Sequence, residues 1–197
     1  MNTYNVILLG ACGVGKSAIS VFYVLNKFPE EYDPTLEDVY RKQLIVYGRI
    51  VELRITDTSG ASDYEALRPD YMAEGDGFIV VYSTTNIESF TRAEEIVALI
   101  KVHRPGAPVI LVGNKNDDIA NRQVTYIDGA IMAKNLHVEF VEIAAYRPTE
   151  AKDVFEKMAK LLVPLPIVDN TKCLCNSLII TIIILIVLSM YLIYLLI

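Results

Sequence analysis

Histidine, cysteine and positive charge are scarce in this 197-residue chain. The two histidines, His103 and His137, are far apart in sequence and lack the spacing of a metal site. Three cysteines do not form a disulfide framework. Lys and Arg number 18 against 24 Asp and Glu, which gives a net charge of −6 and no basic stripe. Nucleic acid is therefore not an expected partner, and any anionic ligand must be held by a local site.

Charge is also absent from residues 178–197, which read LIITIIILIVLSMYLIYLLI. A helix of this length spans roughly 30 Å, the thickness of a bilayer core, and this one would have no polar face. We therefore expect a single-pass transmembrane tail anchor here rather than a buried core helix. Residues 165–177 are then a juxtamembrane linker. The N-terminus, MNTYNVILLG, lacks the basic start of a signal peptide, so we expect residues 1–177 to lie in the cytosol.

The residues around this apolar segment bear on its membrane and its modification. No basic residue follows it, which favours the secretory pathway or plasma membrane over the mitochondrial outer membrane. Cys173 and Cys175 come just before it, where they could be palmitoylated or could simply be small apolar residues at the interface. The chain ends in YLLI, which is not a prenylation motif.

Apolar runs rich in β-branched residues alternate with stretches of helical period in the rest of the chain. The runs predict six strands, at 4–9, 42–47, 50–57, 77–83, 109–114 and 138–143. The other stretches predict five helices, at 16–25, 64–74, 89–103, 127–136 and 149–162. This order predicts an α/β fold with a six-stranded, mostly parallel sheet, one antiparallel edge strand and helices on both faces. Pro164 and Pro166 close a single domain over residues 1–164.

A glycine-rich motif joins the first predicted strand to the first predicted helix. Residues 10–17, GACGVGKS, match the phosphate-binding pattern G-x-x-x-x-G-K-S/T. Its glycines let backbone N–H groups point at phosphate oxygens, and the following helix adds its positive N-terminal end. Lys16 is expected to bridge the β- and γ-phosphates, and the Ser17 hydroxyl to ligate Mg²⁺. A chance glycine turn is a poor alternative, because the pattern fixes four positions.

A second motif indicates which base the nucleotide carries. Asn114-Lys115-Asn116-Asp117 ends a predicted central strand, at the edge where such sheets bind ligands. The Asp117 carboxylate can accept hydrogen bonds from N1–H and the exocyclic amine of guanine. Adenine has no donor at N1 and would leave the carboxylate unpaired. Lys115 can lie over the plane of the base. The two motifs together predict a guanine-nucleotide site.

Across residues 1–164 the chain resembles the Ras family of small GTPases, within the P-loop GTPases. Tyr32 to Asp38, YDPTLED, resembles the effector segment called switch I, and Asp57 to Gly60, DTSG, resembles the start of switch II. Four more residues fit the switch II pattern: Tyr64, Arg68, Tyr71 and Met72. Phe28 matches the aromatic residue that packs against guanine. A transmembrane tail stands in place of the prenylation motif.

The resemblance implies a GTP hydrolase that signals through GTP-dependent switch loops, and the apolar segment 178–197 implies that it is anchored in a membrane. The resemblance also implies GTP or GDP and Mg²⁺ as ligands, with an effector protein, an exchange factor and a GAP as partners, and the apolar segment adds membrane lipid. The implied metal ligands are Ser17, Thr35 and, through water, Asp57, and the implied catalytic residues are Lys16, Thr35 and Gly60. The implied nucleotide contacts are Gly10, Gly13, Val14, Gly15, Lys16, Ser17, Ala18, Phe28, Thr35, Asp57, Gly60, Asn114, Lys115, Asp117, Ala144 and Ala145. The implied effector surface is Tyr32, Asp33, Pro34, Thr35, Leu36, Glu37, Asp38, Val39 and Tyr40.

Three departures from the family pattern bear on the signal. Ala61 occupies the position of the glutamine that orients the attacking water, and Cys12 replaces a glycine near the path of a GAP arginine. Both changes predict slow hydrolysis, and the alternative is a non-hydrolysing, constitutively GTP-bound module that recruits effectors. The family's Ser-Ala-Lys segment near guanine reads Ala144-Ala145-Tyr146 here. The Ala145 N–H can still reach guanine O6, but loss of the two polar side chains predicts faster nucleotide release.

Overall fold

The computed structural model describes residues 1–26, 37–59 and 69–165. Residues Met1–Pro164 form one compact unit, and of the second unit, Leu165–Ile197, only Leu165 is described. In the described ranges no helix is both long and apolar enough to cross a membrane. The expected transmembrane segment, 178–197, lies outside these ranges, as do Cys173 and Cys175.

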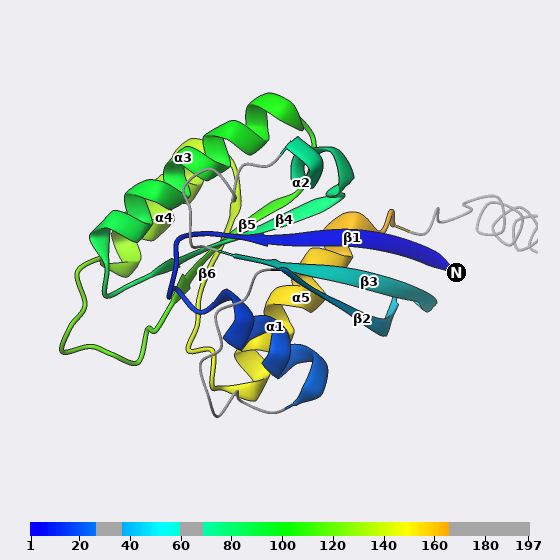
Figure 1. The fold of residues 1–197 in the computed structure, drawn as a ribbon, viewed down its shortest axis with the longest axis horizontal. Helices are drawn as coiled ribbons and strands as arrows, with labels where there is room; N and C mark the ends of the chain where they lie inside the picture. The colour runs from blue at the N-terminus through cyan, green and yellow to red at the C-terminus, as the bar shows by residue number, and fades with distance from the viewer. Residues whose placement is uncertain (27–36, 60–68, 166–197) are drawn as a thin grey trace, which may run out of the picture. The chain divides into compact units, whose positions relative to one another are not determined.

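The predicted six-stranded sheet is confirmed (Figure 1). Its strands, in the spatial order β2-β3-β1-β4-β5-β6, are parallel except for the antiparallel pair β2–β3 at one edge. The bounds are β1 (Asn2–Leu9), β2 (Glu37–Val46), β3 (Arg49–Thr58), β4 (Gly77–Ser83), β5 (Val109–Asn114) and β6 (Glu139–Glu142). Strands β1 and β4 are neighbours although β2 and β3 lie between them in the chain, so the strand order reverses there, where α/β sheets bind ligands.

The edge hairpin differs from its prediction in two ways. Strand β2 begins at Glu37 rather than near Lys42, because Glu37–Arg41 continue the pairing with β3 although they contain no apolar run. The predicted strands 42–47 and 50–57 leave Gly48–Arg49 as the turn, but the two-residue turn is Tyr47–Gly48. Both turn residues have positive φ, 49° and 75°, as a turn that follows the twist of a hairpin requires.

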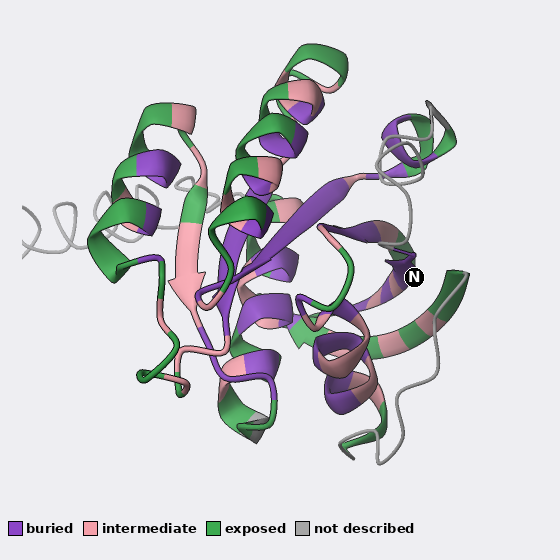
Figure 2. Cartoon of the chain, turned by 60° about the vertical axis from the view of Figure 1, so that its left-hand side comes forward, coloured by how far each residue is buried: buried purple, intermediate pink, exposed green. Residues whose placement is uncertain are grey.

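Helices cover both faces of the sheet (Figure 1). They are α1 (Lys16–Leu25), α2 (Pro69–Glu74), α3 (Ile87–His103), α4 (Tyr126–Leu136) and α5 (Pro148–Leu162). Helices α1 and α5 pack on one face, and α2, α3 and α4 on the other. Strand β1 serves both cores because its side chains alternate: Val6 and Leu8 lie in the first core, Ile7 and Leu9 in the second. Figure 2 shows the buried helix faces turned toward the buried strands.

The parallel strands end at one edge of the sheet, and this edge collects the sequence motifs. Strand β1 leads into Gly10, β3 ends beside Asp57, and β5 ends at Asn114. The segment after β6 lies next to β5, because the Ile143 N–H donates to the Gly113 carbonyl oxygen at 2.8 Å. The fold therefore brings together the described parts of both predicted motifs.

Candidate nucleotide-binding site

The loop after β1 has a backbone that only glycine fits at two positions. Gly10 and Gly15 have φ of 144° and 99°. A Cβ at Gly10 would lie 2.2 Å from the Val81 carbonyl oxygen, and one at Gly15 would lie 2.3 Å from Asn114 Nδ2. Gly15 is also the N-cap of α1 and makes no side-chain capping bond. Because glycine has no side chain, the N-cap residue itself leaves the start of the helix open to an anion such as a phosphate.

Lys16 lies beneath this loop. Its side chain is buried, and Nζ donates to the carbonyl oxygens of Gly10 and Ala11, both at 3.0 Å. Burial lowers the pKa of Lys16, and the Asp57 carboxylate is the larger of the effects that oppose this change. The ammonium group is thus held within the phosphate loop. The negative charge of a phosphate would offset the cost of burying this positive charge.

Asp57, near the end of β3, has surroundings that fit a cation. It is fully buried, and neither carboxylate oxygen has a hydrogen-bond partner of normal geometry in the described part of the chain. Burial raises the pKa of Asp57, and the nearby Ser17 hydroxyl and Lys16 ammonium oppose that rise. A buried carboxylate without partners is costly unless water or a metal satisfies it. Asp57 beside the Ser17 hydroxyl therefore fits Mg²⁺, which takes oxygen ligands and usually keeps several waters.

Asn114 connects the phosphate loop to the segment after β6. Its buried side chain donates from Nδ2 to the Val14 carbonyl oxygen at 2.8 Å and accepts at Oδ1 from the Ala145 N–H at 3.0 Å. The Ala145 N–H, expected to reach guanine O6, would thus be shared with Asn114. Next to it, Lys115 has positive φ, 65°, and its carbonyl oxygen accepts from Thr84 Oγ1 at 2.9 Å. Asp117 is exposed, so its carboxylate is accessible to a ligand.

Three polar side chains lie in or near the segments proposed to bind the base, residues 114–117 and 142–145. They were not identified from the sequence. Arg122 and Glu142 form an ion pair, and Glu150 Oε2 accepts from the Ala144 N–H at 2.7 Å. Glu150 also pairs with Arg147 at 2.9 Å. An acidic residue in the first turn of a predicted helix was the available signal for Glu150. For Arg122 and Glu142 no motif gave a signal, because their partners are distant in sequence.

The residues predicted to control hydrolysis are only partly described. Cys12 is exposed in the phosphate loop and lies near enough to Lys16 to affect its pKa. Ala61 falls outside the described residues, as do Phe28, Thr35 and Gly60. Of these five residues, the described part of the chain therefore contains Cys12, within the phosphate loop.

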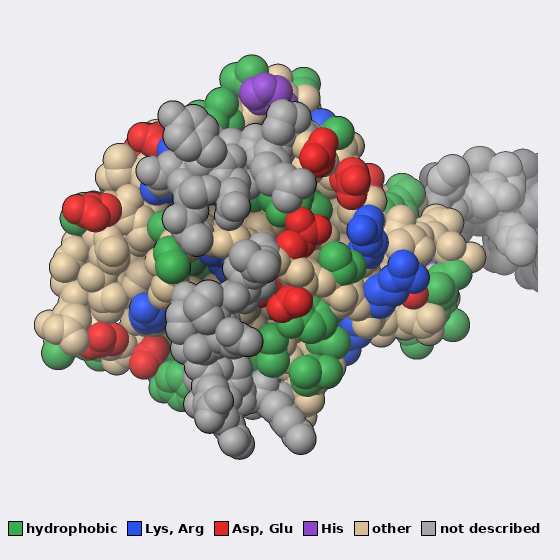
Figure 3. Space-filling view, in the orientation of Figure 1, with side chains coloured by type: hydrophobic (Ala, Val, Ile, Leu, Met, Phe, Trp, Pro, Cys, Tyr) green, Lys and Arg blue, Asp and Glu red, His purple; other side chains and the backbone are tan. Residues whose placement is uncertain are grey.

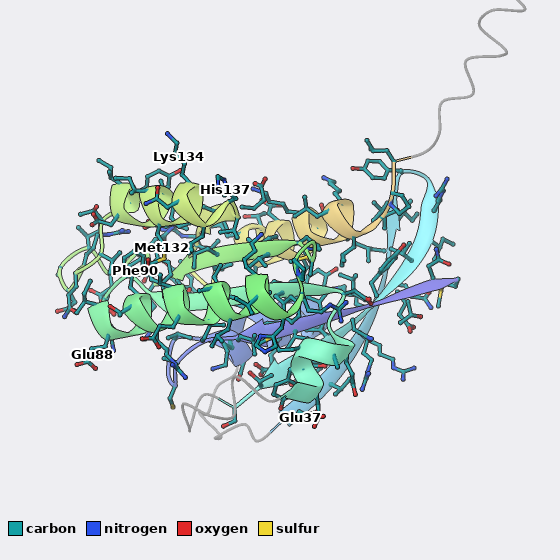
Figure 4. The ribbon with its side chains drawn as sticks, turned by 90° about the horizontal axis from the view of Figure 1, so that it is seen from above. Glu37, Glu88, Phe90, Met132, Lys134 and His137 are labelled. Atoms are coloured by element: carbon teal, nitrogen blue, oxygen red, sulfur yellow. The ribbon has the colours of Figure 1, made fainter. Side chains whose placement is uncertain are left out.

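The described part of the predicted effector surface is the start of β2. Glu37, Asp38 and Val39 are exposed, and Tyr40 is half-buried, whereas residues 32–36 lie outside the described residues. The Tyr71 hydroxyl, from α2, donates to Glu37 Oε2 at 2.7 Å, and Figure 4 shows Glu37 beside that helix. Burial, together with Asp38, raises the pKa of Tyr40 to about 12. On the face drawn in Figure 3, acidic and basic side chains of the described residues are interspersed.

Comparisons with known proteins agree with this geometry. The model of the Ras family matches residues 5–163. The chain is 38% identical over 161 residues to Ras-like protein 1 of Saccharomyces cerevisiae, covering 81% of this chain but 52% of that relative. It is 39% identical over 162 residues to Ras-like protein rasS of Dictyostelium discoideum, covering 81% of this chain and 84% of the relative. It is 38% identical over 159 residues to GTP-binding protein Rit1 of Mus musculus, covering 80% and 73%.

The matched range takes in the phosphate loop, Asp57, the base motif and all the described helices. Members of this family are GTP hydrolases that bind GTP or GDP with Mg²⁺ and signal through effectors, exchange factors and GAPs. The chain therefore belongs to the Ras family of small GTPases.

Proposed function

We propose that this GTPase is anchored in a membrane by its C-terminal tail and stays bound to GTP for long periods because it hydrolyses GTP slowly. The observation that carries the proposal is the state of the phosphate loop. Lys16 and Asp57 are buried and close enough to interact, which supports roles in holding phosphate and Mg²⁺, whereas Cys12 lies exposed in the phosphate loop. The residues proposed to hold GTP match the family pattern. Cys12, close to the place where GTP would be cleaved, differs from it.

In this proposal the nucleotide lies along the carboxyl ends of β1, β3 and β5. Lys16 contacts the β- and γ-phosphates, and Gly10, Gly13, Val14, Gly15 and Ala18 surround the phosphates. Ser17, Thr35 and a water on Asp57 hold Mg²⁺, which neutralises charge on the phosphate oxygens when bound. Gly60 contacts the γ-phosphate. The base lies among Phe28, Asn114, Lys115, Asp117, Ala144 and Ala145.

The guanine assignment has a direct chemical test in Asp117→Asn. Xanthine carries a carbonyl oxygen where guanine carries its exocyclic amine, and an asparagine amide can donate to that oxygen. We expect GTP affinity to fall about 100-fold and XTP affinity to rise, because the variant loses an acceptor for guanine and gains a donor for xanthine. Equal losses for both nucleotides, measured by calorimetry on the full-length chain, would contradict the assignment.

Slow hydrolysis follows from two side chains acting on one step. Ala61 has no group with which to orient the attacking water, and Cys12 lies where a GAP arginine would approach, a contribution worth about 10³–10⁵ in rate. We expect Cys12→Gly combined with Ala61→Gln to speed single-turnover hydrolysis by about tenfold or more. A parent rate equal to that of the double variant would contradict the proposal.

A constitutively GTP-bound module that never hydrolyses GTP is the second candidate. The exposed Cys12 in the phosphate loop favours it over an ordinary switch. The same single-turnover assay separates the two, because this candidate predicts no GDP from the parent even after prolonged incubation. In either case residues 32–40 are the proposed effector surface, and the Glu37–Tyr71 hydrogen bond supports a link between its described part and α2.

The membrane proposal divides the chain into a GTPase domain (1–164), a linker (165–177) and a tail anchor (178–197). Its support is the twenty-residue apolar run without charge. We expect the full-length chain to resist alkaline extraction from secretory-pathway or plasma membranes. Removal of residues 178–197 should release it into the extract. If Cys173 or Cys175 carries palmitate, hydroxylamine should remove a labelled acyl group without releasing the protein.

A further inference from the structure

Arg122, in the loop between β5 and α4, makes hydrogen bonds to three separate segments. One guanidinium nitrogen donates to Glu142 Oε1 and to the Val124 carbonyl oxygen, both at 3.0 Å. The other donates to Glu142 Oε2 at 3.0 Å and to the Asn116 carbonyl oxygen at 3.3 Å. One side chain therefore connects the base motif, the approach to α4 and the end of β6.

The pair with Glu142 is a bidentate, largely buried ion pair, which is a strong type of interaction. The Glu142 side chain is only 7% exposed, against 22% for Arg122. The hydrogen bonds to Glu142 raise the pKa of Arg122 further above its ordinary value. Parallel charge-assisted hydrogen bonds fix geometry as well as energy, and removing one partner of a largely buried pair leaves the other charge without compensation.

The two segments joined by this pair are those proposed to contact guanine. Asn116 immediately precedes Asp117, and its N–H donates to the Ile143 carbonyl oxygen at 3.1 Å. Glu142 begins the segment that ends at Ala145, the proposed contact of guanine O6. A shift of Glu142 relative to Asn116 would therefore separate the carboxylate and the N–H that read the base.

The pair also bears on the departure at residues 144–146. Because residues 144–146 lack the serine and lysine of the family, the sequence predicted that this segment holds the base loosely. In the structure this segment is held by other side chains, with Arg122 on Glu142 at one end and Glu150 on the Ala144 N–H at the other. The segment therefore has two side-chain contacts that do not depend on residues 144–146 themselves being polar.

We propose that Arg122, through its ion pair with Glu142, is a positioning residue that holds the base motif against residues 142–145 and so slows nucleotide release. The proposal rests on the assignment of Asp117 and Ala145 to guanine. It implies that the altered segment does not by itself make release fast, because the ion pair still holds its start at Glu142.

The test measures dissociation of fluorescent GDP from the full-length chain in detergent micelles, for the parent and for Arg122→Ala. We expect release about tenfold faster in the variant, because a tenfold change corresponds to partial loss of one charge-assisted contact. The increase should persist in EDTA, which removes the Mg²⁺ contribution, because the pair acts on the base. Arg122→Lys, which keeps the charge but not the bidentate geometry, should lie between the two.

Arg92→Ala is the matched control. Arg92 has the same 22% exposure and pairs with Glu95 at 2.6 Å, on α3. Its loss should leave GDP release within about twofold of the parent. Glu142→Gln, which preserves the shape of the side chain, tests the pair if Arg122→Ala fails to fold, and it should speed release as well.

Two results separate the possible failures. If Asp117→Asn shifts selectivity toward XTP but the Arg122 and Glu142 variants release GDP at the parent rate, the positioning role is wrong and the guanine assignment stands. If Asp117→Asn leaves selectivity unchanged, the assignment fails and the positioning role fails with it. Equal acceleration by Arg92→Ala would also overturn the proposal, since it would indicate general destabilisation.

Discussion

The two sides of the proposed nucleotide site are shaped by different kinds of interaction. The phosphate side, residues 10–17, is one continuous segment whose form comes from glycine backbone angles and from the start of α1. The base side is assembled from residues 114–117 and 142–145, which are distant in sequence and are joined by hydrogen bonds from the Asn116 N–H to the Ile143 carbonyl oxygen and from the Ala145 N–H to Asn114 Oδ1. A continuous segment can be recognised from one stretch of sequence. A site assembled from two segments also depends on side chains outside any motif. The geometry of the base side can therefore differ between family members that share the same base motif.

The largest expected effect is on the phosphate side, in Gly10→Ala. The new Cβ would lie 2.2 Å from a backbone oxygen of β4 at a φ of 144°, so the loop must move. We expect the free energy of unfolding, measured by urea titration, to fall by about 3 kcal/mol. We also expect GTP binding, measured by calorimetry, to be lost.

Gly106→Ala is the control for that prediction. Gly106 has a similar φ, 158°, but among the described residues, its chain neighbours aside, no atom lies within 4 Å of its would-be Cβ. It should cost about 1–2 kcal/mol from backbone strain alone and leave GTP binding intact. Equal effects of the two variants would show that close approach of the backbone does not shape the loop.

An intermediate effect is expected where the two sides meet, in Asn114→Ala. The variant leaves the Val14 carbonyl and the Ala145 N–H without their buried partner. We expect a loss of about 2–3 kcal/mol in the free energy of unfolding, with faster GDP release. Asn121→Ala removes only exposed contacts to Asp118 and should stay within about 0.5 kcal/mol. Parent-like GDP release from Asn114→Ala would mean that the two sides are independent.

The smallest effect is expected away from both sides, in Thr125→Ala. Thr125 and Asp128 form the capping box of α4, so the variant should lose about 1 kcal/mol with unchanged GDP release. The hydrogen bonds from Thr125 hold the pKa of Asp128 below its ordinary value. Their stabilisation is therefore present above the ordinary Asp pKa of about 3.9 and disappears as the pH falls through the lower folded pKa. The stability gap between parent and variant should narrow in acid, and a constant gap would contradict this origin.

The sequence predicted the fold and the phosphate side well, because both are encoded locally. Alternating apolar periods gave the six strands and the antiparallel pair, and the spacing of glycines, Lys16 and Ser17 gave the loop. The start of β2 was missed because an exposed edge strand needs no apolar run. Arg122, Glu142 and Glu150 were missed because their roles arise only when β6 and α5 are brought beside the base motif.

The account's central claim is that the altered phosphate loop and switch II favour the GTP-bound state. The ratio of GTP to GDP on the full-length protein, isolated rapidly from cells, tests this claim most directly. We predict mostly GTP on the parent and mostly GDP on Cys12→Gly combined with Ala61→Gln. Mostly GDP on the parent would contradict the claim.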